Sequence, residues 1–248
     1  FDTDTELDHN SDRNYSLPAQ ESEIGDIIII ATPDSIIRSV AEQLATTDID
    51  WSNKKVIHCS GSQPASILDS LAKKGAVTAS MHPIQTFKKG DDSDRLTNIY
   101  ISLQGEKSLI SELEYFVKDL NSSPLILDES QKKAVHISAV FASNYLVALL
   151  NTSDTILKDH RIEEGVNILE PLIRQTLKNI LERGAYHSLT GPISRGDSST
   201  IQDHLENLSG NIENKSLYKA LGRVCLAIVK DQETLTVEQI SNLESLLE

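Results

Sequence analysis

Four consecutive isoleucines, residues 27–30, lie between Gly25 and Pro33 and constrain the fold more than any other feature of the sequence. A short, unbroken run of β-branched side chains is typical of a central parallel strand whose two faces are both buried. Beyond Pro33, apolar residues recur at helical spacing over residues 36–44. The segment therefore predicts a buried strand, a tight turn and a helix.

The same pattern recurs along the first half of the chain. Further strands are predicted over residues 54–60, 77–81, 98–104 and 123–127, with helices over residues 62–72 and 108–120. Strands that alternate with helices imply parallel βαβ crossovers. The first half is therefore predicted to be an α/β domain with a doubly wound parallel sheet.

The second half shows helical periodicity without a convincing strand. Helices are predicted over residues 132–151, 165–184, 200–209, 216–230 and 237–247, and residues 189–199 form a loop rich in turn formers. We place the domain boundary near residue 128, which gives a sheet domain over residues 1–128 and a helical domain over residues 129–248.

Charge narrows the classes of partner. The chain has 23 Lys and Arg against 37 Asp and Glu, a net charge of −14. Nucleic acids and anionic membrane surfaces are therefore poor partners, and we expect the chain to bind a small molecule instead. Half of the net charge lies in residues 1–26, and residues 1–23 are predicted to form an acidic, flexible start.

Cysteine use and hydropathy predict a cytoplasmic protein. Cys59 and Cys225 are far apart in the sequence, which argues against a disulfide framework and for a reducing compartment. The longest apolar runs are shorter than the ~20 residues of a membrane span. The first residues are acidic and polar, unlike a signal peptide.

Several well-known motifs are missing from the sequence. It contains no GxGxxG, no GxxxxGK[ST], no HExxH and no CxxC. We therefore predict no metal site, and candidate ligand-binding residues are sought at the strand ends instead.

In an open parallel sheet, ligands bind beyond the carboxyl ends of the strands. Gly61 lets the backbone approach a ligand closely, and Ser60 and Ser62 offer hydroxyls beside a helix N-terminus, which suits a ribose or phosphate oxygen. Residues 60–64 could equally do no more than cap the helix. The predicted cofactor-binding residues are Thr32, Pro33, Asp34, Cys59, Ser60 and Gly61.

His82 follows the third predicted strand, in a loop that also holds Gln85 and Thr86. These three side chains can hydrogen-bond one ligand, and a neutral imidazole can act as an acid or base near pH 7. Alternatively, His82 only ties down the turn. His58 lies within a strand among apolar neighbours and is predicted to be a satisfied core residue.

Two groups in the helical half carry candidate chemistry. His136, Val140 and Asn144 are spaced four residues apart, so His136 and Asn144 can point at the same cleft. Asn144 could instead make a helix-packing hydrogen bond. Arg195, in a glycine-rich loop, can clamp a carboxylate or phosphate, or pair with Asp197 and fix the loop.

Five strings carry a resemblance to a known family: IIIIATPDSII, VIHCSGS, SMHPIQTF, HISAVFASNY and GPISRGDSSTIQDHL. From about Gly25 to its end, the chain resembles the Rossmann-like NADP oxidoreductases whose C-terminal helical domain is catalogued as domain of unknown function 2520. The resemblance implies a Rossmann-like dinucleotide-binding domain with an incomplete first βαβ unit. An all-α domain like that of 6-phosphogluconate dehydrogenase, which forms dimers, would follow it.

The chain departs from this pattern in two places. The broader group often uses a Lys-x-x-x-Asn pair on the first long helix, and here the pair reads Val140 and Asn144. His136 or His82 would have to replace the absent lysine. The family's glycine-rich turn precedes the segment equivalent to Phe1, so residues 1–4 are either the end of the following strand, with an acidic ribose ligand, or an acidic tail.

The resemblance implies an NAD(P)-dependent oxidoreductase, with NADP favoured over NAD, that is a homodimer through its helical half. It would transfer hydride to or from a small anionic substrate at the interdomain cleft. His82 or His136 would be the acid or base, Asn144 would orient the substrate, and Gln85, Thr86 and Arg195 would bind it. The absent fingerprint and lysine favour an alternative: a non-catalytic or degenerate dimeric protein that binds a dinucleotide or another ligand.

Overall fold

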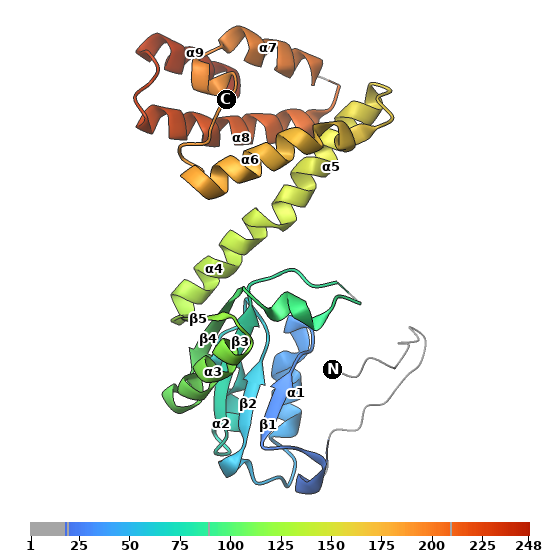
Figure 1. Cartoon of the computed structure of the whole chain (residues 1–248), viewed down its shortest axis with the longest axis vertical. Helices are drawn as coiled ribbons and strands as arrows, with labels where there is room; N and C mark the ends of the chain where they lie inside the picture. The colour runs from blue at the N-terminus through green and yellow to red at the C-terminus, as the bar shows by residue number, and fades with distance from the viewer. Residues whose placement is uncertain (1–17, 19, 89, 209) are drawn as a thin grey trace. The chain divides into compact units, whose positions relative to one another are not determined.

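The computed structural model describes residues 18, 20–88, 90–208 and 210–248 (Figure 1). Most of the acidic start predicted over residues 1–23, including residues 1–4, lies outside the described residues.

The first part of the chain forms a five-stranded sheet in the order β1-β2-β3-β4-β5. The strands are β1 (Ile27–Ile30), β2 (Lys55–His58), β3 (Val77–Pro83), β4 (Tyr100–Gly105) and β5 (Ser123–Ile126). The predicted α/β class is confirmed, but the sheet is not wholly parallel, because β3 and β4 pair antiparallel while the other pairs are parallel. Among the described residues between β3 and β4, the chain forms the short 3₁₀ turn Ser93–Leu96 and no long helix that could carry a parallel crossover.

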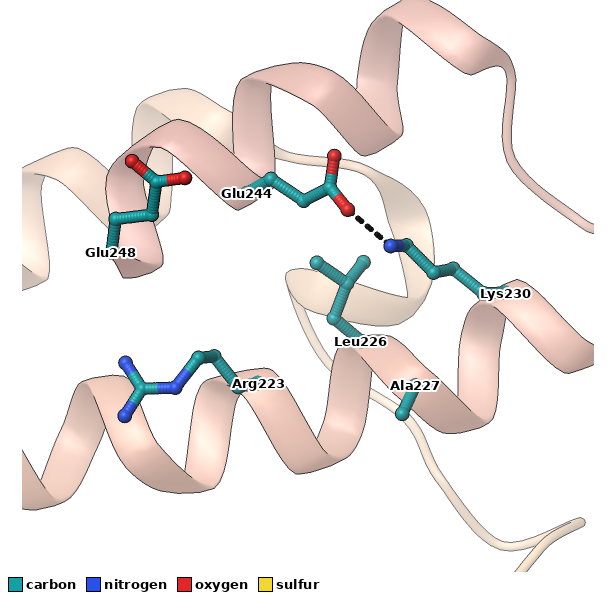
Figure 2. A pocket seen from close by; sticks show the side chains of 6 residues that line it. All are labelled: Arg223, Leu226, Ala227, Lys230, Glu244 and Glu248. Atoms are coloured by element: carbon teal, nitrogen blue, oxygen red, sulfur yellow. Dashed lines mark hydrogen bonds and ion pairs between the residues drawn. The ribbon is translucent and has the colours of Figure 1, made fainter.

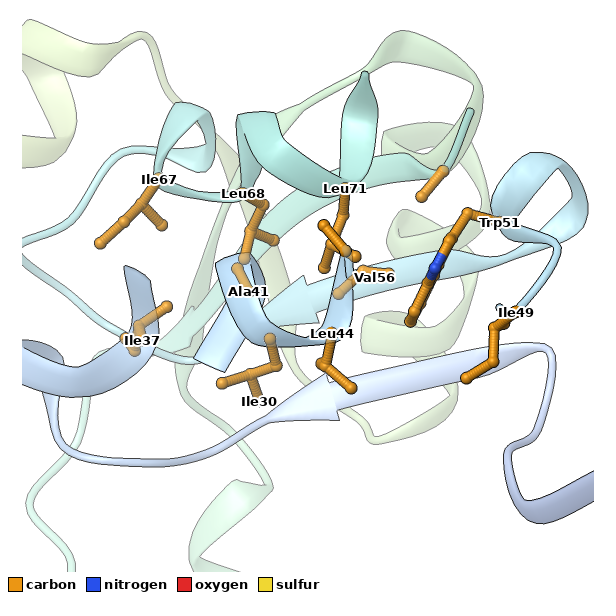
Figure 3. Packing of buried hydrophobic residues seen from close by; sticks show 12 residues of the cluster. Ile30, Ile37, Ala41, Leu44, Ile49, Trp51, Val56, Ile67, Leu68 and Leu71 are labelled. Atoms are coloured by element: carbon orange, nitrogen blue, oxygen red, sulfur yellow. The ribbon is translucent and has the colours of Figure 1, made fainter. Parts of the chain in front are cut away.

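Helices cover both faces of the sheet. On one face, α1 (Ile37–Leu44) and α2 (Asp69–Ala72) pack against β1 and β2, with Trp51 closing one side of this core (Figure 3). On the other face, α3 (Lys107–Asp119) packs against β3 and β4. Val56 joins the first core and Ile57 the second, because successive side chains of a strand point to opposite faces. Each large apolar side chain buried in this way stabilises the fold by roughly 1.5–3 kcal/mol.

The isoleucine strand differs from its prediction. Ile30 is buried against α1, but Ile27 and Ile29 are 56% and 51% exposed. Within the described residues, β1 pairs only with β2 and is covered on one face. The expectation of a strand buried on both faces is therefore wrong for this structure.

The remaining elements are helices: α4 (Glu129–Ala142), α5 (Asn144–Asp159), α6 (Glu170–Arg183), α7 (Ser198–Asn207), α8 (Ile212–Asp231) and α9 (Val237–Leu247). Contacts divide the chain into two compact units, one that extends to Leu146 and one over Val147–Glu248. The first unit thus includes α4, and the predicted domain boundary near residue 128 stays a prediction. In the second unit, α7, α8 and α9 enclose a core of their own that includes Ile201, Val229 and Leu243.

The predicted continuous helix over residues 132–151 is interrupted. Ser143 departs from helical geometry (φ −122°, ψ −73°), so α4 ends at Ala142 and α5 begins at Asn144. Among the described residues, the stretch Glu129–Asp159 has the length and composition to cross a membrane. The same properties fit a helix whose apolar side chains pack against another protein surface.

Candidate active site

Residues 31–34, residues 59–62 and the end of β3 meet at the carboxyl ends of β1, β2 and β3, but His82 lies within β3 and not in a loop after the strand as predicted. The backbone N–H of Cys59 donates to the Ile30 carbonyl over 3.3 Å, and the Ser62 hydroxyl donates to the Asp34 carboxylate over 2.7 Å. The imidazole of His82 hydrogen-bonds the Cys59 carbonyl over 3.0 Å. The predicted cofactor loops over residues 31–34 and 59–62 therefore lie beside the predicted acid or base.

Gly61 lies between two histidine side chains, His82 from β3 and His136 from α4. A Cβ atom on Gly61 would lie 2.6 Å from His82 Nε2 and 2.8 Å from His136 Nδ1, so only glycine fits without displacing a ring. The two imidazole centroids are 6.4 Å apart in an edge-to-face arrangement. We call Gly61, His82 and His136 the strand-end cluster.

Hydrogen bonding fixes the tautomer of His82. A carbonyl oxygen only accepts, so Nδ1 of His82 carries the proton donated to Cys59, and Nε2 of the neutral ring faces Gly61 with its lone pair. Burial lowers the pKa of His82, and the charges of Lys132 and His136 lower it further, against the opposing hydrogen bond to Cys59 and charge of Asp34. At neutral pH this nitrogen can therefore accept a proton or a hydrogen bond from a ligand.

His58 is a satisfied core residue, as predicted. Its ring is fully buried, its Nε2 donates to the Pro64 carbonyl over 3.2 Å, and its Nδ1 accepts from the backbone N–H of Ser60 over 3.2 Å. Burial, assisted by the charge of Lys132, lowers the pKa of His58 to about 4. Both ring nitrogens are occupied, so His58 supports the loop and offers no free atom to a ligand.

Asp34 stays ionised at the mouth of the loops. Partial burial raises the pKa of Asp34, but hydrogen bonds from Ser62 and Ser60 outweigh that effect and place it below its ordinary value. Close by, burial raises the pKa of the Cys59 thiol, so it is protonated at neutral pH. Asp34 is thus an anionic group beside the strand-end cluster, and Cys59 takes part through its carbonyl, which accepts the hydrogen bond from His82.

Lys132 is a site residue that the sequence reasoning missed. Its side chain is 2% exposed, and its ammonium donates to the Ser60 carbonyl and the Ser80 hydroxyl, each over 2.7 Å. Burial lowers the pKa of Lys132 to about 8. The available signal was spacing: Lys132 lies four residues before His136 and continues the series that includes Val140 and Asn144.

Asn144, Gln85 and Thr86 make local hydrogen bonds. The Asn144 side-chain oxygen accepts from the Ser143 hydroxyl over 2.9 Å, just where the helix is interrupted. The Gln85 side-chain oxygen accepts from the backbone N–H of Thr86 over 2.9 Å, and both residues are exposed. Their roles toward a substrate stay predictions.

Arg195 lies in the second compact unit, where it ends the 3₁₀ turn Ile193–Arg195. Asp197 caps α7 by accepting from the backbone N–H of Thr200 over 3.1 Å, and the charge of Arg195 makes a minor contribution to the lowered pKa of this carboxylate. Arg195 is exposed, and its carbonyl accepts from the Gln239 amide over 3.3 Å. Its role as an anion clamp stays a prediction.

The second unit also has a surface hollow between α8 and α9, with a volume of about 310 Å³ (Figure 2). Arg223, Lys230, Glu244 and Glu248 line it, with Leu226 and Ala227, and Lys230 pairs with Glu244. None of the residues predicted for the site lies there. Among the residues that the structure describes, no group of His, Cys, Asp and Glu side chains could hold a metal ion.

Two models of known protein families match the chain. A model of a Rossmann-like domain matches residues 12–83, and the model named domain of unknown function (DUF2520) matches residues 99–225. The fold is thus that of a Rossmann-like α/β protein with a helical C-terminal part, as predicted. The chain belongs to the DUF2520 family, which confirms the resemblance found in its sequence.

Solved structures share this fold. Protein TM1727 from Thermotoga maritima is 24% identical, with a TM-score of 0.69 over 84% of this chain and 80% of that one. The “putative NADP oxidoreductase” BF3122 from Bacteroides fragilis is 21% identical, with a TM-score of 0.69 over 85% of this chain and 80% of that one. An imine reductase from Myxococcus stipitatus in complex with NADP+ is 14% identical, with a TM-score of 0.54 over 90% and 80%. No curated protein matches the sequence.

Proposed function

We propose that this chain is an NAD(P)-dependent oxidoreductase that favours NADP and transfers hydride to or from a small anionic substrate. One observation carries the proposal: the strand-end cluster places a neutral imidazole nitrogen against a glycine, beside the loops that follow β1 and β2. In open α/β sheets these strand ends bind ligands. The names of BF3122 and of the imine reductase complex support the same cofactor class.

The residues of the two loops fit a dinucleotide. The Thr32 hydroxyl oxygen is buried without a hydrogen-bond partner, and an unpaired buried hydroxyl costs about 1–3 kcal/mol. A polar group of a bound ligand would satisfy it. Gly61 packs against both imidazoles, and Asp34 with Ser62 offers a carboxylate and a hydroxyl beside it. When bound, the nicotinamide ring gives or accepts the hydride.

The chain's own residues divide the remaining work. His82 takes or returns a proton through Nε2, the nitrogen that its bond to Cys59 leaves free. His136, whose Nδ1 faces Gly61, is the second candidate for this role. In this proposal Asn144 orients the substrate, and Gln85, Thr86 and Arg195 bind its anionic group.

The proposal includes a homodimer formed through the helical half. No side chain of α5 or α6 is buried, although both helices are rich in leucine. Large apolar side chains on these helices and on α8 are exposed, among them Val147, Leu172, Leu181, Leu221 and Val224. Surfaces of this kind on soluble proteins mark interaction sites, and a second copy of the chain offers the same apolar helices.

Thr32→Val tests the cofactor site. The change removes the unpartnered hydroxyl and keeps the shape of the side chain, so the free energy of unfolding should stay the same or rise. If the hydroxyl bonds the dinucleotide, the Kd for NADPH measured by calorimetry should rise roughly three- to tenfold.

Ser70→Ala is the matched control. The Ser70 hydroxyl is also buried without a partner, but it lies on α2 away from the strand ends, so its removal should leave the Kd unchanged. Absence of NADPH and NADH binding by the unmodified chain at millimolar concentration would overturn the proposed function. Equal Kd values for the unmodified chain and Thr32→Val would remove Thr32 from the site.

A further inference from the structure

A buried ammonium lies behind the strand-end cluster. Lys132 is in the first turn of α4 and is the one buried side chain of that helix. Both groups that it donates to, the Ser60 carbonyl and the Ser80 hydroxyl, are neutral. Burying a charged ammonium against neutral partners costs free energy, so its placement needs a reason beyond packing.

The two acceptors connect the parts of the cluster. Ser60 directly precedes Gly61, and its carbonyl also accepts from the Ser80 hydroxyl over 3.4 Å. Ser80 lies two residues before His82 on β3, so their side chains share one face of the strand. One turn after Lys132, the same helix carries His136. The ammonium therefore ties together the three elements that carry Gly61, His82 and His136.

The charge of Lys132 acts on the imidazoles as well. The charged groups that act on His82 from the elements around it are Asp34, which follows β1, and Lys132 and His136 on α4. The residue just after β2, Cys59, acts through the hydrogen bond to its backbone carbonyl. Burial lowers the pKa of His82 most, and Lys132 is the first charge that lowers it further, against the opposing charge of Asp34. The pKa of Lys132 itself is about 8, so at pH 7 the lysine is mostly protonated.

We propose that Lys132 is a positioning residue of the strand-end cluster. Its ammonium holds the Ser60–Gly61 turn against both histidine rings and keeps a positive charge next to His82, so that Nε2 of His82 remains an acceptor. The importance of this role for catalysis rests on the proposed function, but the role itself is a property of the chain alone and can be measured without cofactor or substrate.

The test is a histidine titration by NMR on the whole chain, without cofactor. Lys132→Met removes the charge and keeps an unbranched side chain, so the pKa of His82 should rise and the Gly61 amide signal should move. Lys133→Met is the matched control, because Lys133 is exposed and pairs with Glu129 over 2.6 Å. It should leave both signals in place. Lys132→Arg keeps the charge and should return the pKa of His82 toward that of the unmodified chain.

If the pKa of His82 is the same in Lys132→Met as in Lys133→Met, the proposal is overturned. If Lys132→Met does not fold, Ser80→Ala provides the second arm, because it removes one acceptor and leaves the ammonium. The Gly61 amide and the His82 titration should then both move, and no change in either would equally overturn the proposal. NADPH calorimetry on the unmodified chain tests the proposed function separately, so the two failures are distinguishable.

Discussion

His58 and His82 are both neutral at the strand ends, yet only one of them has a nitrogen free for chemistry. Both ring nitrogens of His58 are hydrogen-bonded within the protein. His82 uses Nδ1 on the Cys59 carbonyl and turns Nε2 toward Gly61. The hydrogen-bond partners of each ring therefore separate a supporting histidine from a candidate acid or base.

The neutral burial of His58 predicts acid instability. The fold lowers the pKa of His58 from 6.5 to about 4. Between these two pH values His58 is protonated in the unfolded chain and neutral in the folded chain. Stability contributed by His58 is therefore present above pH 6.5 and is lost as the pH falls toward 4, by on the order of 3 kcal/mol. Urea unfolding at a series of pH values should show a shallower slope for His58→Gln than for the unmodified chain. His160→Gln, at an exposed position, is the control. Equal slopes for His58→Gln and the unmodified chain would contradict this assignment.

Gly61→Ala tests the contact between the turn and the two imidazoles. Its methyl group would overlap both rings, which should cost about 1–3 kcal/mol of stability and weaken NADPH binding. Gly25→Ala is the control, because a Cβ there meets nothing closer than 3.8 Å. Chemical denaturation and calorimetry on both variants give the comparison, and an unaffected Gly61→Ala would mean that the rings do not lie against this residue.

At the residue scale, sequence reasoning found the groups that follow directly after strands. Gly61 and His82 could be predicted as neighbours because the carboxyl ends of parallel strands share one edge of a sheet. Lys132 could not be identified from its neighbours in the sequence, because a lysine next to another lysine near the start of a helix is predicted to be exposed. Only the shared helix face with His136 indicated it.

At the level of the elements, local sequence patterns predicted whether a segment is a helix or a strand better than they predicted its burial and its pairing. The isoleucine run is a strand, but one face of it is exposed. Four consecutive isoleucines give the same sequence pattern whether a strand is buried on one face or on both. The antiparallel turn between β3 and β4 depends on the path of a loop that carries no periodic signal. The break at Ser143 is also absent from the hydrophobic pattern, which continues through it.

The start of α4 gives a prediction at the element scale. The Asp128 carboxylate and the Gln131 side chain form a capping box, with hydrogen bonds of 2.8 Å and 2.9 Å to each other's backbone N–H. Asp128→Ala should cost about 1 kcal/mol. It should also shift the His82 titration, because the Lys132 backbone N–H donates to the Asp128 carbonyl over 2.9 Å.

Thr236→Ala removes the corresponding capping box of α9 in the second unit. It should cost a similar amount of stability and leave His82 unchanged. An unchanged His82 titration in Asp128→Ala would show that α4 does not set the position of the ammonium.

At the scale of the whole molecule, the exposed apolar helices of the second unit bear on assembly. Leu181 on α6 is 85% exposed, and in a homodimer through this half a charge there would be buried. Leu181→Lys should therefore weaken the dimer about tenfold or more in sedimentation velocity. Val237→Lys, at an equally exposed position (84%) in the first turn of α9, should not. A monomeric unmodified chain would contradict the proposed assembly.

Amide shift mapping shows whether the strand-end loops bind a nicotinamide dinucleotide. NADPH is added to the labelled whole chain, and backbone signals are followed in both units. We expect saturable shifts at Thr32, Ser60 and Gly61, with none at Leu226 and Ala227 in the hollow of the second unit. Shifts confined to that hollow, or no shifts at all, would contradict this expectation.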